Sequence, residues 1–371
     1  MIFFMKYRFC FLLISMMLSS CSYSLLKNSE IISLLQRDPD VEIDVLNCEE
    51  DWEQQFDYGT ILKVDNKYVM YYRAISFNVV PHELYCYAES EDGIHWVRTK
   101  TGVFNYMGSY DNNIITDRVD GVSVDYVDGT FYMLVDRVYD EKNEIHRGLG
   151  LYKSNDGINF ERDNDFNVPF FCDTQNQLMW DPTSKTFKLY LRSWYDSKKP
   201  LIKYSQFSQY RSVSLLETPT LKYGLIPDEN ARHFTDMKVP SINKELPVIM
   251  ENTSVNLDYD IYGAYVNRYR DGLYIAYPIN YYHTPSKKNG GKYDNDGYGT
   301  IGMWISKDGR EFEEIKRDYI TNGDKWIESC IGHVETDSTF IHYYIPFNNT
   351  HAERCVKNTI RARIHYKSKK K

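Results

Sequence analysis

The sequence lacks the features that mark several large classes of protein. None of its 7 cysteines forms a Cys-x-x-Cys pair, so no metal site is expected. The formal net charge is -8 and the basic tail KSKKK is short, so the basic face that nucleic-acid binding needs is missing. Helical periodicity is nearly absent, apart from one short turn expected near residues 28–37. No apolar run after residue 20 is long enough to span a bilayer, and no cofactor is expected.

The first 20 residues have the pattern of a secretion signal. Lys6 and Arg8 precede the short apolar run FCFLLISMML, and small residues follow it. The end of this segment, Leu-Ser-Ser-Cys, resembles the lipobox of bacterial lipoproteins, which implies cleavage before Cys21 and a lipid on its thiol. The alternative is an ordinary signal peptide that contains a cysteine. Ser22 after the cysteine favours, by the same resemblance, the outer membrane, with membrane contact only through the lipid. The following segment SYSLLKNSE lacks the acidic run that would argue for surface export, so the periplasmic side is expected.

This interpretation divides the chain into a signal peptide (1–20), a tether and N-terminal segment (21–48) and a main domain (49–371). The main domain and tether keep five widely spaced cysteines, among which the sequence allows one disulfide but does not pair it: Cys48, Cys86, Cys172, Cys330 and Cys355. The oligomeric state cannot be derived from the sequence.

Aromatic residues are abundant, with 33 Tyr, 18 Phe and 6 Trp. Aromatic side chains suit strands, and most of these residues are expected to serve that purpose. Tyr-rich, strand-rich proteins also often bind sugars, because aromatic rings stack on the C–H faces of pyranoses.

One short pattern occurs three times, as SEDGIHW from Ser90, SNDGINF from Ser154 and SKDGREF from Ser306. Asp-Gly between apolar residues predicts a two-residue hairpin turn, because Gly accepts a positive φ. Each copy is therefore interpreted as the turn between the two outer strands of a repeated unit. The aspartates Asp92, Asp156 and Asp308 are expected to lie far from any central channel.

A second unit, consisting of a strand, a polar turn and a Tyr-rich strand, occurs five times. Its copies are centred on Tyr68, Phe131, Phe187, Leu273 and Phe340. Five antiparallel four-stranded units predict an all-β fold, the five-bladed β-propeller. A barrel or stacked sandwiches would also use alternating strands, but would not produce five units with matched internal turns. The fourth strand of the fifth blade is either missing or supplied by the N-terminal segment VEIDV (41–45).

The innermost strands of a propeller line its channel, so acids at the start of those strands should meet at one rim. The sequence places at least one acid there in every blade: Glu53 and Asp57, Asp117 and Asp120, Asp173, Asp258 and Asp260, and Glu328. Crowded carboxylates raise one another's pKa, and two carboxyl groups with separated pKa values are what glycoside hydrolysis requires.

Over roughly residues 50 to 350 the chain resembles the five-bladed superfamily of glycoside hydrolase families 32, 43, 62, 68, 117 and 130. It is closest to uncharacterised bacterial lipoproteins with a family 32 amino-terminal domain. The segment WEQQFDYG (52–59) resembles Trp-Met-Asn-Asp-Pro-Asn-Gly and aligns Asp57 with the family nucleophile. The segment DTQNQLMW resembles the Arg-Asp-Pro segment and implies that Asp173 stabilises the transition state, although Cys172 replaces the arginine.

By the same resemblance, DIYG aligns Asp260 with the general acid, where the family has glutamate. Because Asp is one C–C bond shorter, by about 1.5 Å, Glu53 and Glu328 are alternative acids. The resemblance implies a carbohydrate substrate, with a glycosidase as the leading function. A non-catalytic glycan-binding propeller and a family 130-like phosphorylase are the alternatives, although no compact Arg/His cluster for phosphate is visible in the sequence. A purely structural propeller would not need converging carboxylates.

Further residues are candidates for substrate binding. Arg73 and Arg192 end the second strands of blades one and three at the same offset, from which they could pair with the rim acids. Asp120 belongs to the rim of blade two, and Trp52 could stack on a sugar. His283, in NYYHTP, lies on a blade-four loop expected to overhang the funnel, next to the polar segment 285–299.

Overall fold

The computed structural model describes residues 29–117, 119–139, 145–168, 172–196, 209–222, 246–252, 259–269 and 272–367. The predicted signal peptide, Cys21 and the rim acid Asp258 lie outside these ranges. Within the ranges, no helix is long and apolar enough to cross a membrane.

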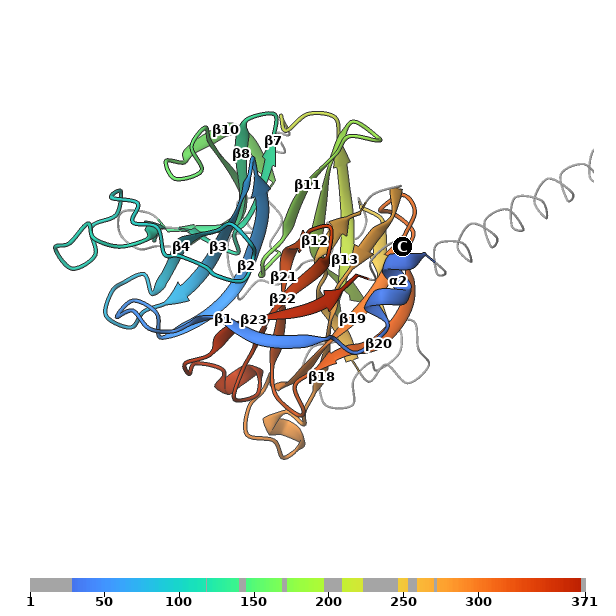
Figure 1. Cartoon of the computed structure of the whole chain (residues 1–371). Helices are drawn as coiled ribbons and strands as arrows, with labels where there is room; N and C mark the ends of the chain where they lie inside the picture. The colour runs from blue at the N-terminus through green and yellow to red at the C-terminus, as the bar shows by residue number, and fades with distance from the viewer. Residues whose placement is uncertain are drawn as a thin grey trace, which may run out of the picture.

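Antiparallel strands form five units around a common axis, which confirms the all-β propeller (Figure 1). Blade one comprises β2 (Gln55–Val64), β3 (Lys67–Ile75), β4 (Glu83–Ser90) and β5 (Ile114–Thr116). Blade two comprises β6 (Val119–Asp120) and β7 (Ser123–Val127) at the inner position, then β8 (Thr130–Tyr139), β9 (Ile145–Ser154) and β10 (Glu161–Val168). Blade three comprises β11 (Gln177–Asp181), β12 (Thr186–Asp196), β13 (Gln209–Thr218) and β14 (Val248–Met250).

Blade four is interrupted in its two inner positions. It comprises β15 (Tyr259–Gly263) and β16 (Val266–Arg268), β17 (Tyr274–Ala276) and β18 (Ile279–His283), then β19 (Gly297–Ser306) and β20 (Glu313–Thr321). Blade five comprises β21 (Ile327–Glu335), β22 (Thr339–Pro346), β23 (Thr359–Tyr366) and β1 (Val41–Asn47). Short 3-10 turns occur at Lys287–Asn289 and at His351–Glu353.

The N-terminal segment closes the ring. Strand β1 pairs antiparallel with β23 from Val41↔Ile364 to Asn47↔Thr359, so the expectation that VEIDV supplies the last strand of blade five is confirmed (Figure 1). The short turn expected near 28–37 is the helix α2 (Glu30–Leu35). Four apolar side chains of α2 are buried in a core shared with blades four and five: Ile31, Ile32, Leu34 and Leu35.

The repeated Asp-Gly segments are turns between outer strands, but not the two-residue turns that the sequence predicted. In blade two, β9 ends at Ser154 and β10 begins only at Glu161. The Asp156 carboxylate accepts the backbone N–H groups of Ile158 and Asn159 at 2.9 and 2.8 Å, and the Ser154 hydroxyl accepts that of Gly157 at 2.9 Å. These side chains accept the backbone N–H groups that would otherwise pair between the two strands of a tight hairpin. The turn is therefore wider than a two-residue hairpin turn.

Each of these turns is also fixed to the preceding blade by a buried tyrosine. Tyr71 of β3 donates its hydroxyl to the Gly157 carbonyl at 2.8 Å, Tyr190 of β12 to Gly309 at 3.0 Å, and Tyr343 of β22 to Gly93 at 2.5 Å. The three glycines have φ values of 75°, 70° and 76°, in the left-handed region. A Cβ on Gly157 would lie 2.6 Å from the Tyr71 hydroxyl, so only Gly fits this contact between blades.

We therefore predict that Tyr71→Phe lowers the free energy of unfolding by about 1 kcal/mol, because a buried carbonyl loses its donor. Gly157→Ala should cost more, since it adds a steric clash to a positive φ. Urea unfolding of both variants measures the effect. Tyr366→Phe, at a side chain that is 51% exposed, is the matched control and should change stability by less than about 0.5 kcal/mol. Equal effects of Tyr71→Phe and Tyr366→Phe would contradict the role of this hydrogen bond.

Candidate active site

The inner strands of the five blades begin at one end of the propeller, where a hollow of about 430 Å³ opens. We call this hollow the funnel. Five acids lie at or just before the starts of these strands and are called the rim acids: Asp57 on β2, Asp120 on β6, Asp173 before β11, Asp260 on β15 and Glu328 on β21. Of these five, Asp173 lines the funnel, while the other four are buried with at most 1% exposure.

Asp57 and Asp120 share one arginine. Asp57 lies directly opposite Arg73 in the β2–β3 ladder, just before an irregularity in the register. The Arg73 guanidinium donates through Nε and Nη2 to the two oxygens of Asp57 and through Nη1 to Asp120 of the next blade. Gln55 adds a hydrogen bond to Asp57 at 3.3 Å. Arg73 lines the funnel and covers both acids, so neither carboxylate is exposed to a ligand.

Asp173 occupies a different environment. Its side chain is 28% exposed, and its backbone has a φ of 49°, in the left-handed region that is strained for a non-glycine residue. Asp136 accepts the Asp173 backbone N–H at 3.1 Å, and Arg192 Nη1 donates to the Asp173 carbonyl at 2.5 Å. The Arg192 guanidinium also lies 3.7 Å from the Asp173 carboxylate. The strained residue is therefore held with its carboxylate at the funnel wall.

A second arginine from blade three covers Asp260. Arg211 of β13 donates both its backbone N–H and Nη1 to the Asp260 carboxylate, at 3.1 and 3.2 Å, and His283 Nε2 lies 3.3 Å away. Burial alone would raise the pKa of Asp260, but Arg211 and His283 outweigh it and lower this pKa to about 2. Asp260 is ionised at neutral pH, so it has no proton for the role of general acid that the resemblance implied.

Glu328 shows the opposite behaviour. Burial, and then the negative charge of Asp57, raise the pKa of Glu328 to about 7. Trp326 Nε1–H donates to one carboxylate oxygen at 2.9 Å, and the backbone N–H of Tyr58 lies 3.4 Å from the other. Tyr58 and Arg354 line the funnel, whereas Glu328 is buried and does not line it. Near neutral pH, this carboxyl group is partly protonated.

Two sequence candidates are not brought to the funnel. Both carboxylate oxygens of Glu53 accept hydrogen bonds from Arg98, at 2.9 and 2.7 Å, and Tyr72 donates to one of them at 2.7 Å. Trp52 donates to Asn113 at 3.1 Å, and its ring lies 5.5 Å from that of Tyr106. These contacts place both side chains in the packing of blade one. His283 also does not line the funnel, and it contacts the rim acid Asp260 at 3.3 Å.

Other funnel residues were missed by sequence reasoning: Tyr58, Arg211, Tyr262, His351 and Arg354. Arg211 belongs to the blade-three copy that has lost Asp-Gly, and His351 and Arg354 lie in the loop between β22 and β23, so no repeat marks them. Tyr58 could have been suspected, because it follows Asp57 directly. The guanidinium carbons of Arg73 and Arg192 lie 4.3 and 3.9 Å from the ring centres of Tyr58 and Tyr262.

The funnel wall is therefore rich in cationic and aromatic groups. Three arginines line it, and burial lowers the pKa of His351 well below its usual value, so this imidazole is neutral. Its Nε2 lies 3.2 Å from the Tyr262 hydroxyl. In the described ranges, no group of three or more His, Cys, Asp or Glu side chains is placed to hold a metal ion. The five described cysteines are free thiols.

No family model matches the sequence, and no curated protein matches it. Solved structures do resemble its fold. One is an N-acetylgalactosamine deacetylase from F. plautii in complex with blood group B trisaccharide, with a TM-score of 0.54 and 12% identity over 88% of this chain and 94% of that one. Another is described only as a glycoside hydrolase, with a TM-score of 0.52 and 14% identity over 88% and 92%.

A third similar structure belongs to the GH130 family of mannoside phosphorylases, which contains glycoside hydrolases that target β-1,2 mannosidic linkages in Candida mannan. Its TM-score is 0.51, with 13% identity over 88% of this chain and 92% of that one. The chain thus has the fold of the propeller glycoside hydrolases, as the resemblance in its sequence indicated. At these identities the likeness concerns the fold.

The arrangement of Arg73 leads to a prediction about stability. Arg73→Leu leaves two fully buried carboxylates without their cation, so it should lower the free energy of unfolding by roughly 3–5 kcal/mol. The matched control is Arg361→Leu, which removes an exposed pair with Asp44 (35% and 38% exposed side chains) and should cost less than about 1 kcal/mol. Guanidinium unfolding of both variants compares them. Similar losses would show that the buried network is not held by Arg73.

Proposed function

We propose that this protein is a glycoside hydrolase that cleaves an oligo- or polysaccharide in the funnel. In this proposal Asp173 acts as the ionised carboxylate and Glu328 as the proton donor. The observation that carries the proposal is the contrast between these two acids. Asp173 is partly exposed and flanked by arginine at 3.7 Å, and Glu328 is buried with a pKa of about 7. Glycoside hydrolysis uses one ionised and one protonated carboxyl group.

The exposure of Asp173 supports its role. A carboxylate that attacks an anomeric carbon, or activates the water that does so, must touch the sugar, and Asp173 is the rim acid that lines the funnel. Its left-handed backbone, fixed by Asp136 and Arg192, keeps the carboxylate in place before substrate arrives. The Arg192 guanidinium lies 3.7 Å from this carboxylate.

Glu328 is the best-placed acid because of its surroundings. Burial of the site, and then the negative charge of Asp57, raise the pKa of Glu328 to about 7, which keeps the proton on it below that pH. Glu328 does not itself line the funnel, so we propose that its proton reaches the leaving oxygen through one bridging water at the Tyr58 side, where the Tyr58 backbone N–H lies 3.4 Å from Glu328. Asp57, which the resemblance aligned with the nucleophile, would then act on Glu328 through its charge, since Arg73 and Gln55 occupy its oxygens.

A second candidate function follows from the cationic wall. The sequence did not reveal an Arg/His cluster, but Arg73, Arg211, Arg354 and His351 all line the funnel beside Asp173. An accessible rim carboxylate beside several guanidinium groups would also suit a phosphorylase, in which inorganic phosphate replaces water as the acceptor. We further propose that the protein works in the bacterial cell envelope, held by a lipid on Cys21. The signal-like pattern of residues 1–20 supports this location.

The hydrolase proposal predicts that Asp173→Asn lowers kcat on the cleaved glycan by at least about 100-fold, and Glu328→Gln by roughly 100- to 10,000-fold. Wild-type activity should fall as the pH rises above about 7, because Glu328 loses its proton there. In Glu328→Gln, the remaining activity should no longer show this decrease with rising pH. Aryl glycosides, which need no protonation of the leaving group, should partly rescue Glu328→Gln.

The assay screens fructans, arabinans and mannosides for released reducing ends, with Asp111→Asn as the control, since the Asp111 side chain is 66% exposed. Binding of a glycan without turnover in the wild type would overturn the enzyme proposal and leave a glycan-binding propeller.

Product analysis separates hydrolysis from phosphorolysis. With inorganic phosphate in the buffer, the hydrolase should release the free sugar at an unchanged rate. If the protein is a hydrolase, the rate of sugar release by Arg354→Met should also be unchanged by inorganic phosphate, as in the wild type. Formation of a sugar 1-phosphate, with a phosphate KM that rises in Arg354→Met, would replace the hydrolase proposal by the phosphorylase.

A further inference from the structure

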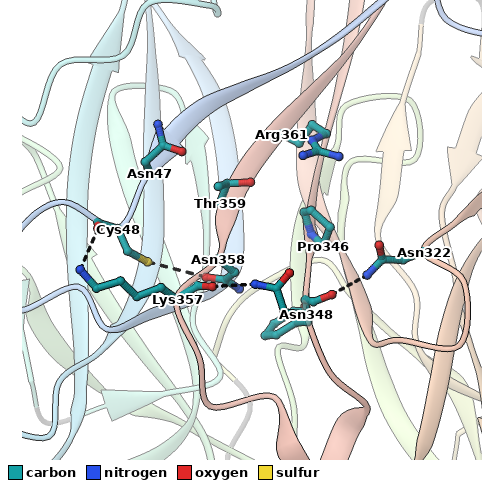
Figure 2. Close-up of a pocket in the computed structure, with 10 residues that line it drawn as sticks. Asn47, Cys48, Asn322, Pro346, Asn348, Lys357, Asn358, Thr359 and Arg361 are labelled. Atoms are coloured by element: carbon teal, nitrogen blue, oxygen red, sulfur yellow. Dashed lines mark hydrogen bonds between the residues drawn. The ribbon is translucent and has the colours of Figure 1, made fainter.

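A second hollow lies on the same end of the propeller as the funnel, beside blade five. It measures about 460 Å³ and forms where β1, β20 and β22 end and β23 begins (Figure 2). Polar groups dominate its lining, which includes the four asparagines Asn47, Asn322, Asn348 and Asn358. None of its lining residues is an acid, which makes it unlike the funnel.

The hydrogen bonds inside the second hollow determine which groups are left for a ligand. The Asn322 amide nitrogen donates to the carbonyls of Trp326 and Phe347 at 2.9 and 2.7 Å, and that of Asn348 donates to Lys357 at 3.0 Å. Their side-chain oxygens therefore remain as acceptors. Figure 2 shows Asn348 and Asn322 on neighbouring parts of the wall, with Pro346 between them and Arg361.

The two cations of this hollow are already engaged. Lys357 donates to the Cys48 carbonyl at 3.3 Å, and Arg361 donates to Asp44 at 2.7 Å (Figure 2 shows the first contact). Thr359 also donates to Asp44, at 3.1 Å. The Asp44 carboxylate pairs with Arg361, whereas the neutral Cys48 carbonyl leaves the charge on Lys357. Because this cation remains and no acid lines the hollow, a cation is not the favoured occupant. The amide oxygens of Asn322 and Asn348 and the Lys357 ammonium suit the hydroxyl groups of a sugar, and the partly exposed Pro346 ring offers a small apolar face.

One loop forms a wall between the two hollows. In the connection from β22 to β23, His351, Arg354 and Cys355 line the funnel, whereas Phe347, Asn348, Lys357 and Asn358 line the second hollow. Asn348 and His351 are three residues apart, so their Cα atoms lie within about 10 Å of each other.

The loop is also tied down. Asp296 accepts hydrogen bonds from the Thr350 hydroxyl at 3.0 Å and from the Ala352 N–H at 2.8 Å. The wall between the two hollows is therefore held in place.

We infer that the second hollow is a distal subsite, which holds a sugar unit of the same glycan chain whose reacting end occupies the funnel. The natural substrate is then a chain of several sugars rather than a disaccharide. The inference rests on the proposed function to the extent that the funnel holds a glycan, but it does not require that the glycan is cleaved.

The test fills the second hollow without touching the funnel. Asn348→Trp and Asn47→Trp place a large side chain at two exposed positions of its lining, and Asn155→Trp makes the same change at an exposed turn of blade two. Binding is measured by retardation in native gels that contain inulin, arabinan or yeast mannan. Near-UV circular dichroism checks that each variant is folded.

For a polysaccharide that retards the wild type, Asn348→Trp and Asn47→Trp should each weaken binding by roughly tenfold, while Asn155→Trp leaves it unchanged. Asp173→Asn should abolish turnover but keep the retardation. Weaker binding of the two hollow variants, with no turnover in any protein, would support the distal subsite and reject the hydrolase. If the wild type cleaves the polysaccharide and Asn348→Trp and Asn47→Trp are retarded as strongly as the wild type, the hydrolase is supported and the distal subsite is rejected. If none of the three polysaccharides retards the wild type, the distal subsite is overturned.

Discussion

The arrangement of the site depends on the buried Arg73, which stands between carboxylates from two blades. Asp57 and Asp120 are both completely buried, and a pair of ionised carboxylates in such a place is unfavourable without a cation. Arg73 supplies that cation from the strand next to Asp57, so the β2–β3 ladder places it and the ion pairs join blade one to blade two. The same side chain forms part of the funnel wall, which makes the surface seen by a ligand cationic where the acids behind it are anionic.

This constraint separates the roles of the rim acids. Arg73 covers Asp57 and Asp120, and Arg211 covers Asp260 and keeps it ionised. Arg192 donates hydrogen bonds to the backbone carbonyls of Asp173 and Tyr262. The Asp173 carboxylate itself remains partly exposed in the funnel. Asp57 has a further effect at short range, because its charge helps to raise the pKa of Glu328. In our proposal, the acid that the resemblance marked as nucleophile instead sets the protonation of its neighbour.

The blades could be predicted from the sequence because strand pairing is a local property of repeated segments. Counting four strands per blade predicts that VEIDV pairs with blade five. The equal positions of Arg73 and Arg192 in their strands suggest that Arg73 pairs with a rim acid. The width of the Asp-Gly turns could not be predicted, because it depends on side-chain bonds such as those of Asp156. The sequence also did not show which rim acids are covered by arginines. Arg211 comes from the third strand of blade three, and Arg354 comes from the loop between β22 and β23. Such coverage arises from packing between blades, which no local pattern records.

The most direct test of this account is a crystal structure of Asp173→Asn in complex with the glycan that the wild type cleaves. The account predicts a sugar ring in the funnel between Asn at position 173 and the wall of Tyr58 and Arg354, with its glycosidic oxygen on the Tyr58 side and Arg73 still bridging Asp57 and Asp120. A sugar bound outside the funnel, or one that displaces Arg73 and contacts Asp57 directly, would contradict it.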